Sequence, residues 1–249
     1  MKKILILAML FLNTYAQEES QKVTIGAGPY LQTQPYSGVK EIVVPSPVIF
    51  FDNGLFYARW TRLGMYVFGE KNDDFSWGVS ITGQPRVNNY KASDSAALTG
   101  MDDKKSSIEA GLAFSAALEK SHLEVMVLSD ALGRYDSWVA TSELGYDFEI
   151  GKFKFYPSLI AIYQSSKFMN YYYGVSQEES LTSAHSPYSA NAGVQLGAQT
   201  YIRYPLTDKL SALANMRVDK LSSQATNSPI VSDDYIYSGL ISLIYAFEY

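Results

Sequence analysis

The chain has 249 residues, of which 47% are hydrophobic and 14% aromatic, with a formal net charge of −5. It contains no Cys, which excludes disulfides and thiolate metal sites, and its mild acidity argues against nucleic acid as a partner. The mean hydropathy is close to zero, as expected for a chain in which apolar and polar residues alternate.

The first residues are typical of a secretory signal peptide. Lys2 and Lys3 form a positive n-region before a short apolar run at residues 4–12. Residues 1–16 are therefore predicted to be a signal peptide, and residues 17–249 a single domain. No later stretch approaches about 18 consecutive apolar residues, so no transmembrane helix is expected.

The remaining chain alternates apolar and polar residues in segments of strand length. The expected strands cover residues 23–32, 42–51, 55–60, 63–70, 75–82, 108–118, 122–130, 138–149, 155–164, 190–203, 209–219 and 235–249. Residues 42–51 are the least regular of these, because Pro45 and Pro47 fit poorly inside a hydrogen-bonded ladder.

The last of these segments, residues 235–249, has the character of a membrane strand. Its odd positions are almost wholly apolar with aromatics at both ends, whereas Ser238, Ser242 and Glu248 place polar groups on the other face. A span of about ten residues with aromatic ends suits a lipid-facing barrel strand. The closing Tyr249 resembles the C-terminal signal that the barrel assembly machinery reads in bacterial outer-membrane proteins. An edge strand of a soluble sandwich is the alternative.

The lengths of the connections favour a barrel over a sandwich. Short connections fall at residues 52–54, 71–74, 119–121, 150–152 and 204–208, and long ones at 33–41, 84–105, 166–188 and 221–234. A reversal near residues 61–62 gives twelve strands and places every long loop on one side, as outer-membrane barrels do. The prediction is therefore an all-β, antiparallel transmembrane β-barrel of twelve strands, with short periplasmic turns and long outer loops. Ten spanning strands with a hairpin that does not cross is the alternative, because segments 55–60 and 63–70 are short.

Two histidines are the main candidates for catalysis. A hydrolase needs a nucleophile, a base and an orienting group within hydrogen-bond reach. His122 is expected to face the lumen beside a periplasmic turn, and His185 lies in a long loop beside Ser186. Both are interpreted as ordinary polar residues. No catalytic, cofactor-binding or metal-binding residue is predicted, and no cofactor is expected.

Charged residues on the polar strand faces are expected to fill the lumen. The acidic group comprises Glu109, Glu124, Asp130, Glu143, Asp147 and Glu149, and the basic group Arg59, Arg203, Lys209 and Arg217. A salt-bridged plug is favoured over a charge-lined pore, because a barrel of ten to twelve strands has little free lumen. Glu178–Glu179 and Asp233–Asp234 are expected as solvated charge on outer loops, with divalent-cation bridging to lipopolysaccharide as the alternative.

Several stretches resemble the MltA-interacting protein/OmpV family of outer-membrane proteins. The matching pieces are GAGPY at 26–30, ARWTRLGMYVFG at 58–69, NYYYGVS at 170–176, NSPIV at 227–231 and Tyr245-Ala246-Phe247 at the end. The resemblance implies an outer-membrane barrel. In one family member it also implies a scaffold that joins a lytic transglycosylase to a peptidoglycan synthase, and in others a surface antigen or adhesion factor.

The expected function is accordingly non-enzymatic. The chain is predicted to be an outer-membrane barrel with a structural or scaffolding role, and the resemblance implies a link to peptidoglycan-remodelling enzymes. The expected partners are outer-membrane lipid, lipopolysaccharide and the barrel assembly machinery, with a lytic transglycosylase and a peptidoglycan synthase implied by the resemblance. The alternatives are a narrow channel for small solutes and, third, a surface lipid hydrolase.

Overall fold

The computed structural model describes residues 22–72 and 75–248, so the predicted signal peptide and Tyr249 lie outside the described residues. Within this part of the chain one antiparallel sheet contains thirteen strand segments. They are β1 (Lys22–Gln32), β2 (Ile42–Asp52), β3 (Phe56–Arg59), β4 (Arg62–Lys71), β5 (Phe75–Arg86), β6 (Ser107–Leu118), β7 (Ser121–Asp130), β8 (Trp138–Tyr146), β9 (Phe148–Ile150), β10 (Phe153–Gln164), β11 (Gly193–Pro205), β12 (Leu210–Lys220) and β13 (Tyr235–Glu248).

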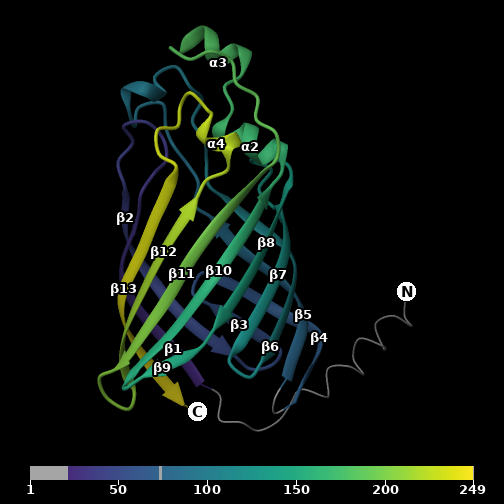
Figure 1. The fold of residues 1–249 in the computed structure, drawn as a ribbon, viewed down its shortest axis with the longest axis vertical. Helices are drawn as coiled ribbons and strands as arrows, with labels where there is room; N and C mark the ends of the chain where they lie inside the picture. The colour runs from purple at the N-terminus through teal and green to yellow at the C-terminus, as the bar shows by residue number, and fades with distance from the viewer. Residues whose placement is uncertain (1–21, 73–74, 249) are drawn as a thin grey trace, which may run out of the picture.

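The sheet closes on itself into a barrel (Figure 1). The final strand β13 pairs with β12 on one side and with β1 on the other, from Lys22↔Glu248 to Gln32↔Ser238. The ring is completed where β10 pairs with β11. Because β8 and β9 are two parts of one strand that both pair with β10, the barrel has twelve strands, and the predicted fold class is confirmed.

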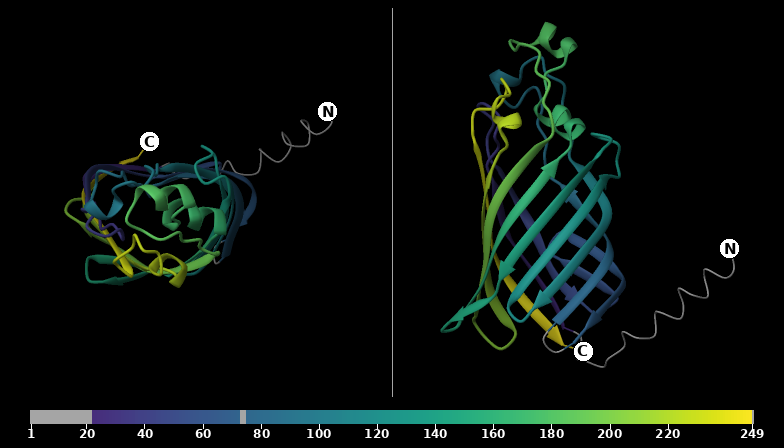
Figure 2. Two further views of the ribbon diagram at one scale, coloured as in Figure 1. Left: turned by 90° about the horizontal axis from the view of Figure 1, so that it is seen from above. Right: turned by 45° about the vertical axis from the view of Figure 1, so that its right-hand side comes forward.

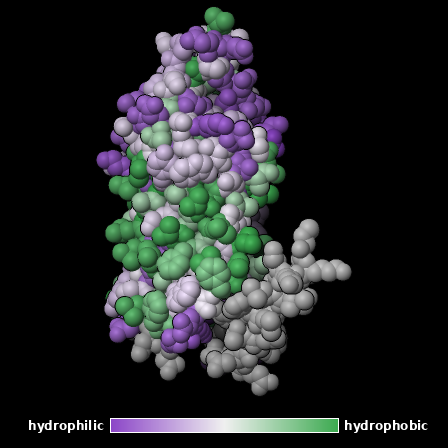
Figure 3. Space-filling view, turned by 90° about the vertical axis from the view of Figure 1, so that its right-hand side faces the viewer, coloured by the Kyte–Doolittle hydropathy of each residue, from purple (hydrophilic) through white to green (hydrophobic). Residues whose placement is uncertain are grey.

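Side-chain alternation separates the lipid face from the lumen. On β13, Ile241 is 70% exposed and Leu243 is 56% exposed, whereas the neighbouring Leu240 and Ser242 are buried. The same alternation recurs on β6 and β7, where the outward face carries Leu112 and Val127. On the face that Figure 3 shows, apolar residues form a band across the lower half of the molecule, below the polar outer loops. This band matches the apolar belt of an outer-membrane barrel.

The hairpin β3–β4 departs from regular barrel geometry. β3 has only four residues and pairs with β2 over Phe50–Asp52 alone. The chain reverses at Trp60, whose φ of +58° is in the left-handed region. β3 is thus too short to cross the barrel wall, and Figure 1 shows it in the lower half. The predicted reversal near residues 61–62 and the count of twelve strands are confirmed, and the expected shortness of segment 55–60 is seen in β3.

Long connections gather at one end of the barrel and carry short helices that the alternation pattern did not predict. These are the 3₁₀ turn η2 (Ala96–Leu98) and the helices α2 (Ser166–Tyr173), α3 (Gln177–Thr182) and α4 (Ser223–Thr226). Ser165 caps α2 by accepting a hydrogen bond from the Phe168 N–H (3.3 Å). Viewed from above, the helical loops lie over the barrel mouth (Figure 2). None of the helices in residues 22–72 and 75–248 is long and apolar enough to cross a membrane.

Neighbouring positions on β11 provide a test of this fold. Leu196 is 56% exposed on the outward face, and Gln195 is 8% exposed on the lumen face. In reconstituted membranes, a fluorophore on Leu196→Cys should be quenched by a lipid-borne spin label, because lipid chains surround that face. The matched Gln195→Cys fluorophore should be quenched much less. Equal quenching of the two probes would contradict the barrel.

Candidate functional site

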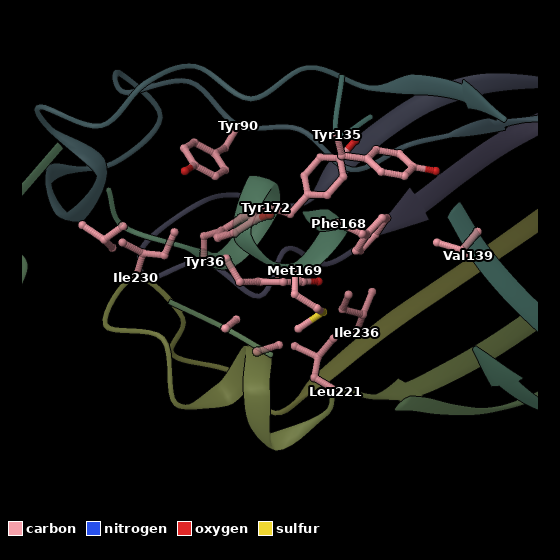
Figure 4. Packing of buried hydrophobic residues seen from close by; sticks show 14 of the residues in the cluster. Tyr36, Tyr90, Tyr135, Val139, Phe168, Met169, Tyr172, Leu221, Ile230 and Ile236 are labelled. Carbon is pink, nitrogen blue, oxygen red and sulfur yellow. The ribbon is translucent and has the colours of Figure 1, made fainter. Parts of the chain in front are cut away.

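Outer loops close the barrel mouth with a cap of buried apolar residues. The cap comprises Tyr36, Tyr90, Leu98, Phe168, Met169, Tyr172, Tyr173 and Ile230, which come from four different connections and are at most 2% exposed. Figure 4 shows six of them converging between the loops, namely Tyr36, Tyr90, Phe168, Met169, Tyr172 and Ile230. Tyr36 and Tyr90 meet edge to face with their ring centroids 4.6 Å apart. The cap therefore has a hydrophobic core of its own above the lumen.

Two stretches that carry the family resemblance meet inside the cap. Residues 170–176 include Tyr172 and Tyr173 at the end of α2, and residues 227–231 include Ser228 and Ile230. The Ser228 hydroxyl donates to the Tyr173 carbonyl (2.6 Å), which ties the two loops together.

Glu179 joins the α3 loop to the loop that follows β5. Its carboxylate accepts hydrogen bonds from the N–H groups of Ser176 (2.8 Å) and Asp102 (3.1 Å) and from the Lys104 ammonium (2.9 Å). Burial alone would raise the pKa of Glu179, but the Ser176 N–H and Lys104 hold that pKa below its ordinary value. The expectation of solvated charge at Glu178–Glu179 is therefore wrong for Glu179, which is 5% exposed, and right for the exposed Glu178. Asp233 and Asp234 are both exposed, as predicted.

Beneath the cap the lumen contains compact groups of charges. Glu124 on β7 pairs with Arg59 (2.9 Å) and Arg62 (2.5 Å), both from the β3–β4 hairpin. Glu109 on β6 makes two 2.8 Å bonds to Arg86, and it also accepts from the Tyr135 hydroxyl of the cap (2.7 Å). Charge-assisted, bidentate contacts of this kind fix the position of both partners. The Glu124 contacts hold the β3–β4 hairpin in place, and the Glu109 contacts hold Tyr135 beneath the cap.

Other charges are neutralised locally. Arg217 forms a two-bond contact with Asp219 on the same strand, at 2.6 and 2.7 Å. Glu143 accepts from the Ser158 hydroxyl (2.6 Å) and the Gln199 amide (2.7 Å), so it links β8, β10 and β11. The predicted lumen salt bridges are thus present, but the prediction that they form a plug is wrong, because a cavity of about 880 Å³ remains among them.

Three charges assigned to the lumen by alternation lie elsewhere. Glu149 and Lys209 are exposed at the periplasmic end, where strand alternation no longer faces the lumen, and Glu149 pairs there with Lys154 (2.9 Å). Asp130 lies at the outer rim, where its carboxylate accepts from the N–H groups of Tyr135 (2.7 Å) and Asp136 (3.0 Å). Asp130 therefore shapes a loop instead of lining the cavity.

Neither histidine is part of a Ser–His–Asp arrangement among the residues that the structure describes. His122 Nδ1 lies 3.5 Å from Asp147, and its ring packs against Gly145, where an added Cβ would lie 2.0 Å from Nε2. His185 Nε2 contacts the Ala97 carbonyl (2.5 Å) in the cap. Their ring nitrogens are thus directed at a carboxylate and a backbone carbonyl, and the His185 backbone N–H donates to the Ser183 hydroxyl (3.3 Å).

An apolar patch on the lumen wall was not predicted from the sequence. Val48, Leu213, Leu240 and Ile244 point inward and are buried, with Tyr30, Phe50, Trp60 and Tyr201 packed against them. The inward face of β13 was expected to be polar because of Ser238 and Ser242. Its apolar members could have been noticed in the sequence as Leu240 and Ile244, but only the pairing of β12, β13, β1 and β2 brings them together with Val48 and Leu213.

These groups surround one cavity of about 880 Å³. Its lining runs from Arg86 and Asp219 under the cap to His122 and Asp147 near the periplasmic turns. The lining includes the apolar patch as well as the charged residues Arg59, Glu124 and Glu143. The volume falls in the range of pockets that hold small ligands, about 300–1,000 Å³.

A closed twelve-stranded barrel with an outward apolar band, short turns at one end and a loop-capped mouth at the other is an outer-membrane protein. The comparisons agree: the family model described as MltA-interacting protein MipA matches residues 25–247, and the chain belongs to that family. The MltA-interacting protein of Escherichia coli K12 is 28% identical over 96% of each chain. Outer membrane protein OmpV of Vibrio cholerae is 25% identical over 71% of this chain and 67% of its own length.

Among solved structures, an outer membrane channel from Pseudomonas putida F1 covers 94% of this chain and 98% of its own, with 10% sequence identity and a TM-score of 0.44. OmpV and outer membrane protein Omp26La of Vibrio anguillarum, which is 26% identical over 70% of this chain and 66% of its own length, are named as outer-membrane proteins, and this chain is located in the outer membrane.

Glu179 allows a direct test of how the cap is held. Glu179→Gln should weaken the cap by about 1.5–3 kcal/mol, because hydrogen bonds to a charged group are lost or reduced. Since its folded-state pKa is lowered, the stabilisation is present above the ordinary carboxyl pKa and is lost as the pH falls through the lowered value. Hydrogen–deuterium exchange at neutral pH should therefore be faster over residues 166–182 in Glu179→Gln. The exposed neighbour Glu178→Gln should exchange like the unmodified protein, and identical exchange in both variants would contradict the assignment.

Glu124 allows a second test, on the lumen. Glu124→Gln leaves Arg59 and Arg62 facing each other without their shared carboxylate, and breaking a buried pair in this way costs about 3–5 kcal/mol. The temperature at which the compact barrel is lost, read from heat-dependent gel mobility, should fall clearly. Glu149→Gln removes an exposed pair at the periplasmic end and should leave that temperature almost unchanged. A fall of equal size in both variants would argue against a bracing role for Glu124.

Proposed function

We propose that this barrel is a non-enzymatic scaffold of the outer membrane that holds a lytic transglycosylase near the cell wall. A relative that covers nearly the whole chain bears the name MltA-interacting protein, which supports this class of partner. The observation that carries the proposal is a group of apolar side chains at the periplasmic end. There Ile150 is 62% exposed, Leu206 49% and Phe153 45%.

The apolar group lies on two neighbouring hairpins. Ile150 and Phe153 flank the turn between β9 and β10, and Leu206 begins the turn between β11 and β12. The Phe153 and Tyr204 rings lie 4.8 Å apart and bridge these hairpins. Figure 1 shows both turns at the lower end of the barrel. Exposed apolar residues bordered by charges, here Glu149 and Lys154, mark protein interaction sites.

In this arrangement the barrel supplies position and the partner supplies chemistry. The scaffold presents its periplasmic hairpins toward the peptidoglycan, and the lipid-facing strands restrict the partner to the inner surface of the outer membrane. The lumen charges neutralise one another and stiffen the wall that holds the hairpins. A peptidoglycan synthase would join as a second partner through the bound transglycosylase.

The test is capture of a lytic transglycosylase from solubilised envelope. The double variant Ile150→Asp/Leu206→Asp should reduce capture about tenfold or more, a loss of roughly 1.4 kcal/mol or greater. The matched control is Leu181→Asp, which alters an 87% exposed leucine on the outer cap and should capture the enzyme normally. Heat-dependent mobility checks that each variant is assembled. Equal capture by an assembled double variant would overturn the proposed contact surface.

A narrow channel for small solutes is the second candidate, and the cavity of about 880 Å³ favours it. The cap opposes it, because buried aromatic residues from four connections cover the mouth. Conductance in planar bilayers separates the two functions. The scaffold should give no stable conductance steps, and Glu179→Gln should raise conductance only if the cap is the gate of a channel.

A further inference from the structure

The barrel wall is incomplete in its outer half. β2 runs over its full length beside β1, but on its other side the pairing with β3 ends at Phe50↔Arg59. The pairing of β4 with β5 likewise ends at Leu63↔Gly83. Above the tip of the short hairpin, residues 42–48 of β2 and 84–86 of β5 have no partner strand on the facing edges, within the part of the chain that is described.

This opening lies at the depth of the lipid chains. Through β1, Val43 is level with Gly239 and Pro47 is level with Leu243 on β13. Both levels lie between the outward aromatics Tyr237 and Tyr245, which mark the two ends of the membrane strand. The outer half of a barrel with periplasmic turns below faces the outer leaflet.

Prolines occupy the free edge of β2. The Ile49 carbonyl accepts from the Trp60 N–H (2.8 Å), so Ile49 faces the hairpin edge. Alternate residues of a strand share an edge, which places Pro47 and Pro45 on that edge above Ile49. Proline has no N–H, so both positions lack the donor that would otherwise point into the opening.

A third proline occupies the free edge of β5. The Ile108 carbonyl accepts from the Ala131 N–H (2.8 Å) and therefore faces β7. Its partner Pro85 consequently faces away from β6 and toward the opening. All three prolines thus remove donors that lipid could not satisfy. The opening is therefore encoded in the sequence of both edges.

The opening has defined borders and leads into the lumen. At its lower border the Trp60 indole donates to the Ser46 hydroxyl (3.0 Å). At its upper border the Gln32 amide donates to the Val87 carbonyl (3.4 Å). The cavity of about 880 Å³ is lined by residues of both free edges, including Val44 and Gln84.

The cavity behind the opening is lined by an apolar patch and by charged residues. Just inside Trp60 lies the apolar patch of Val48, Leu213, Leu240 and Ile244. Beside it, on the β3–β4 hairpin and on β7, the cavity lining carries Arg59, Arg62 and Glu124. We propose that the break between β2 and β5 is a lateral portal through which a single-chain amphiphile enters the lumen from the outer leaflet. Its alkyl chain lies on the apolar patch and its polar headgroup lies toward Arg59, Arg62 and Glu124.

A strand of another protein fits this opening poorly. Strand addition requires a row of N–H and C=O groups on the receiving edge. Pro45, Pro47 and Pro85 interrupt that row on both sides. An alkyl chain needs no hydrogen bonds and tolerates such an edge.

The opening is tested first by its contact with lipid. Val44 points toward the lumen, as Gln195 does, yet it is 43% exposed at the portal. In vesicles of brominated phosphatidylcholine, a fluorophore on Val44→Cys should be quenched about as strongly as one on the lipid-facing Leu196→Cys. The Gln195→Cys fluorophore, behind an intact wall, should be quenched several-fold less. Quenching at Val44→Cys as weak as at Gln195→Cys would show a sealed wall and overturn the proposal.

Ligand entry is tested with dibromostearate in a Trp77→Phe/Trp138→Phe background, which leaves Trp60 as the one tryptophan of the three. Quenching of Trp60 should saturate and should be reversed by unbrominated stearate. Val44→Phe narrows the portal and should weaken the apparent affinity about tenfold, whereas Val43→Phe on the lipid face should not. Quenching that never saturates, or equal affinities in the two assembled variants, would overturn the proposal. Capture of a transglycosylase should be unchanged in both, so failure of the portal is distinguishable from failure of the scaffold.

Discussion

Satisfaction of backbone hydrogen bonds in lipid is the constraint on which this structure depends. Each unpaired N–H or C=O in the hydrocarbon region costs several kcal/mol, so a membrane sheet must close. Here closure is achieved where β13 pairs with β1 and where β10 pairs with β11. Within residues 22–72 and 75–248, the sheet is interrupted between β2 and β5, where Pro45, Pro47 and Pro85 carry no N–H to leave unpaired.

The interior follows from the same closure. Once the strands form a ring, their inward residues meet across a narrow lumen, and charges there are stable only when paired. Glu124 with Arg59 and Arg62, and Glu109 with Arg86, meet this requirement. Both groups also hold the irregular parts in place: the first supports the short hairpin, and the second reaches the cap through Tyr135. The charged residues therefore support the two features that distinguish this barrel from a plain cylinder.

The cap and the portal together determine the side from which a ligand can reach the lumen. The mouth is covered by residues such as Tyr90, Phe168 and Ile230, whereas the side wall is open toward lipid. A lumen closed to the exterior and open to the outer leaflet suits a membrane-derived ligand better than a water-soluble one. The periplasmic hairpins remain free to hold a partner, so the proposed scaffold and the proposed portal use separate surfaces of one molecule.

The sequence by itself determined the class of fold. Strand alternation, the aromatic ends of residues 235–249 and the one-sided long loops together indicate a barrel. Each of these features can be read along the chain, as a period of two residues or as the length of a segment, without knowledge of contacts between segments. The lumen charges Glu109, Glu124 and Arg217 were also predictable, since alternation fixes which face a residue takes. Alternation gave the wrong placement for Glu149 and Lys209, because they lie at the periplasmic end of the barrel, where neither face of the strand is directed at the lumen.

Only the tertiary structure decided the rest, because it depends on contacts between segments far apart in the chain. Glu179 is buried only because Asp102 and Lys104 reach it from another loop. The apolar lumen patch exists only because ring closure brings Val48 beside Leu240. The height of the β3–β4 hairpin, and with it the opening in the wall, is set by its pairing with β2 and β5, and strand alternation carries no information about pairing length.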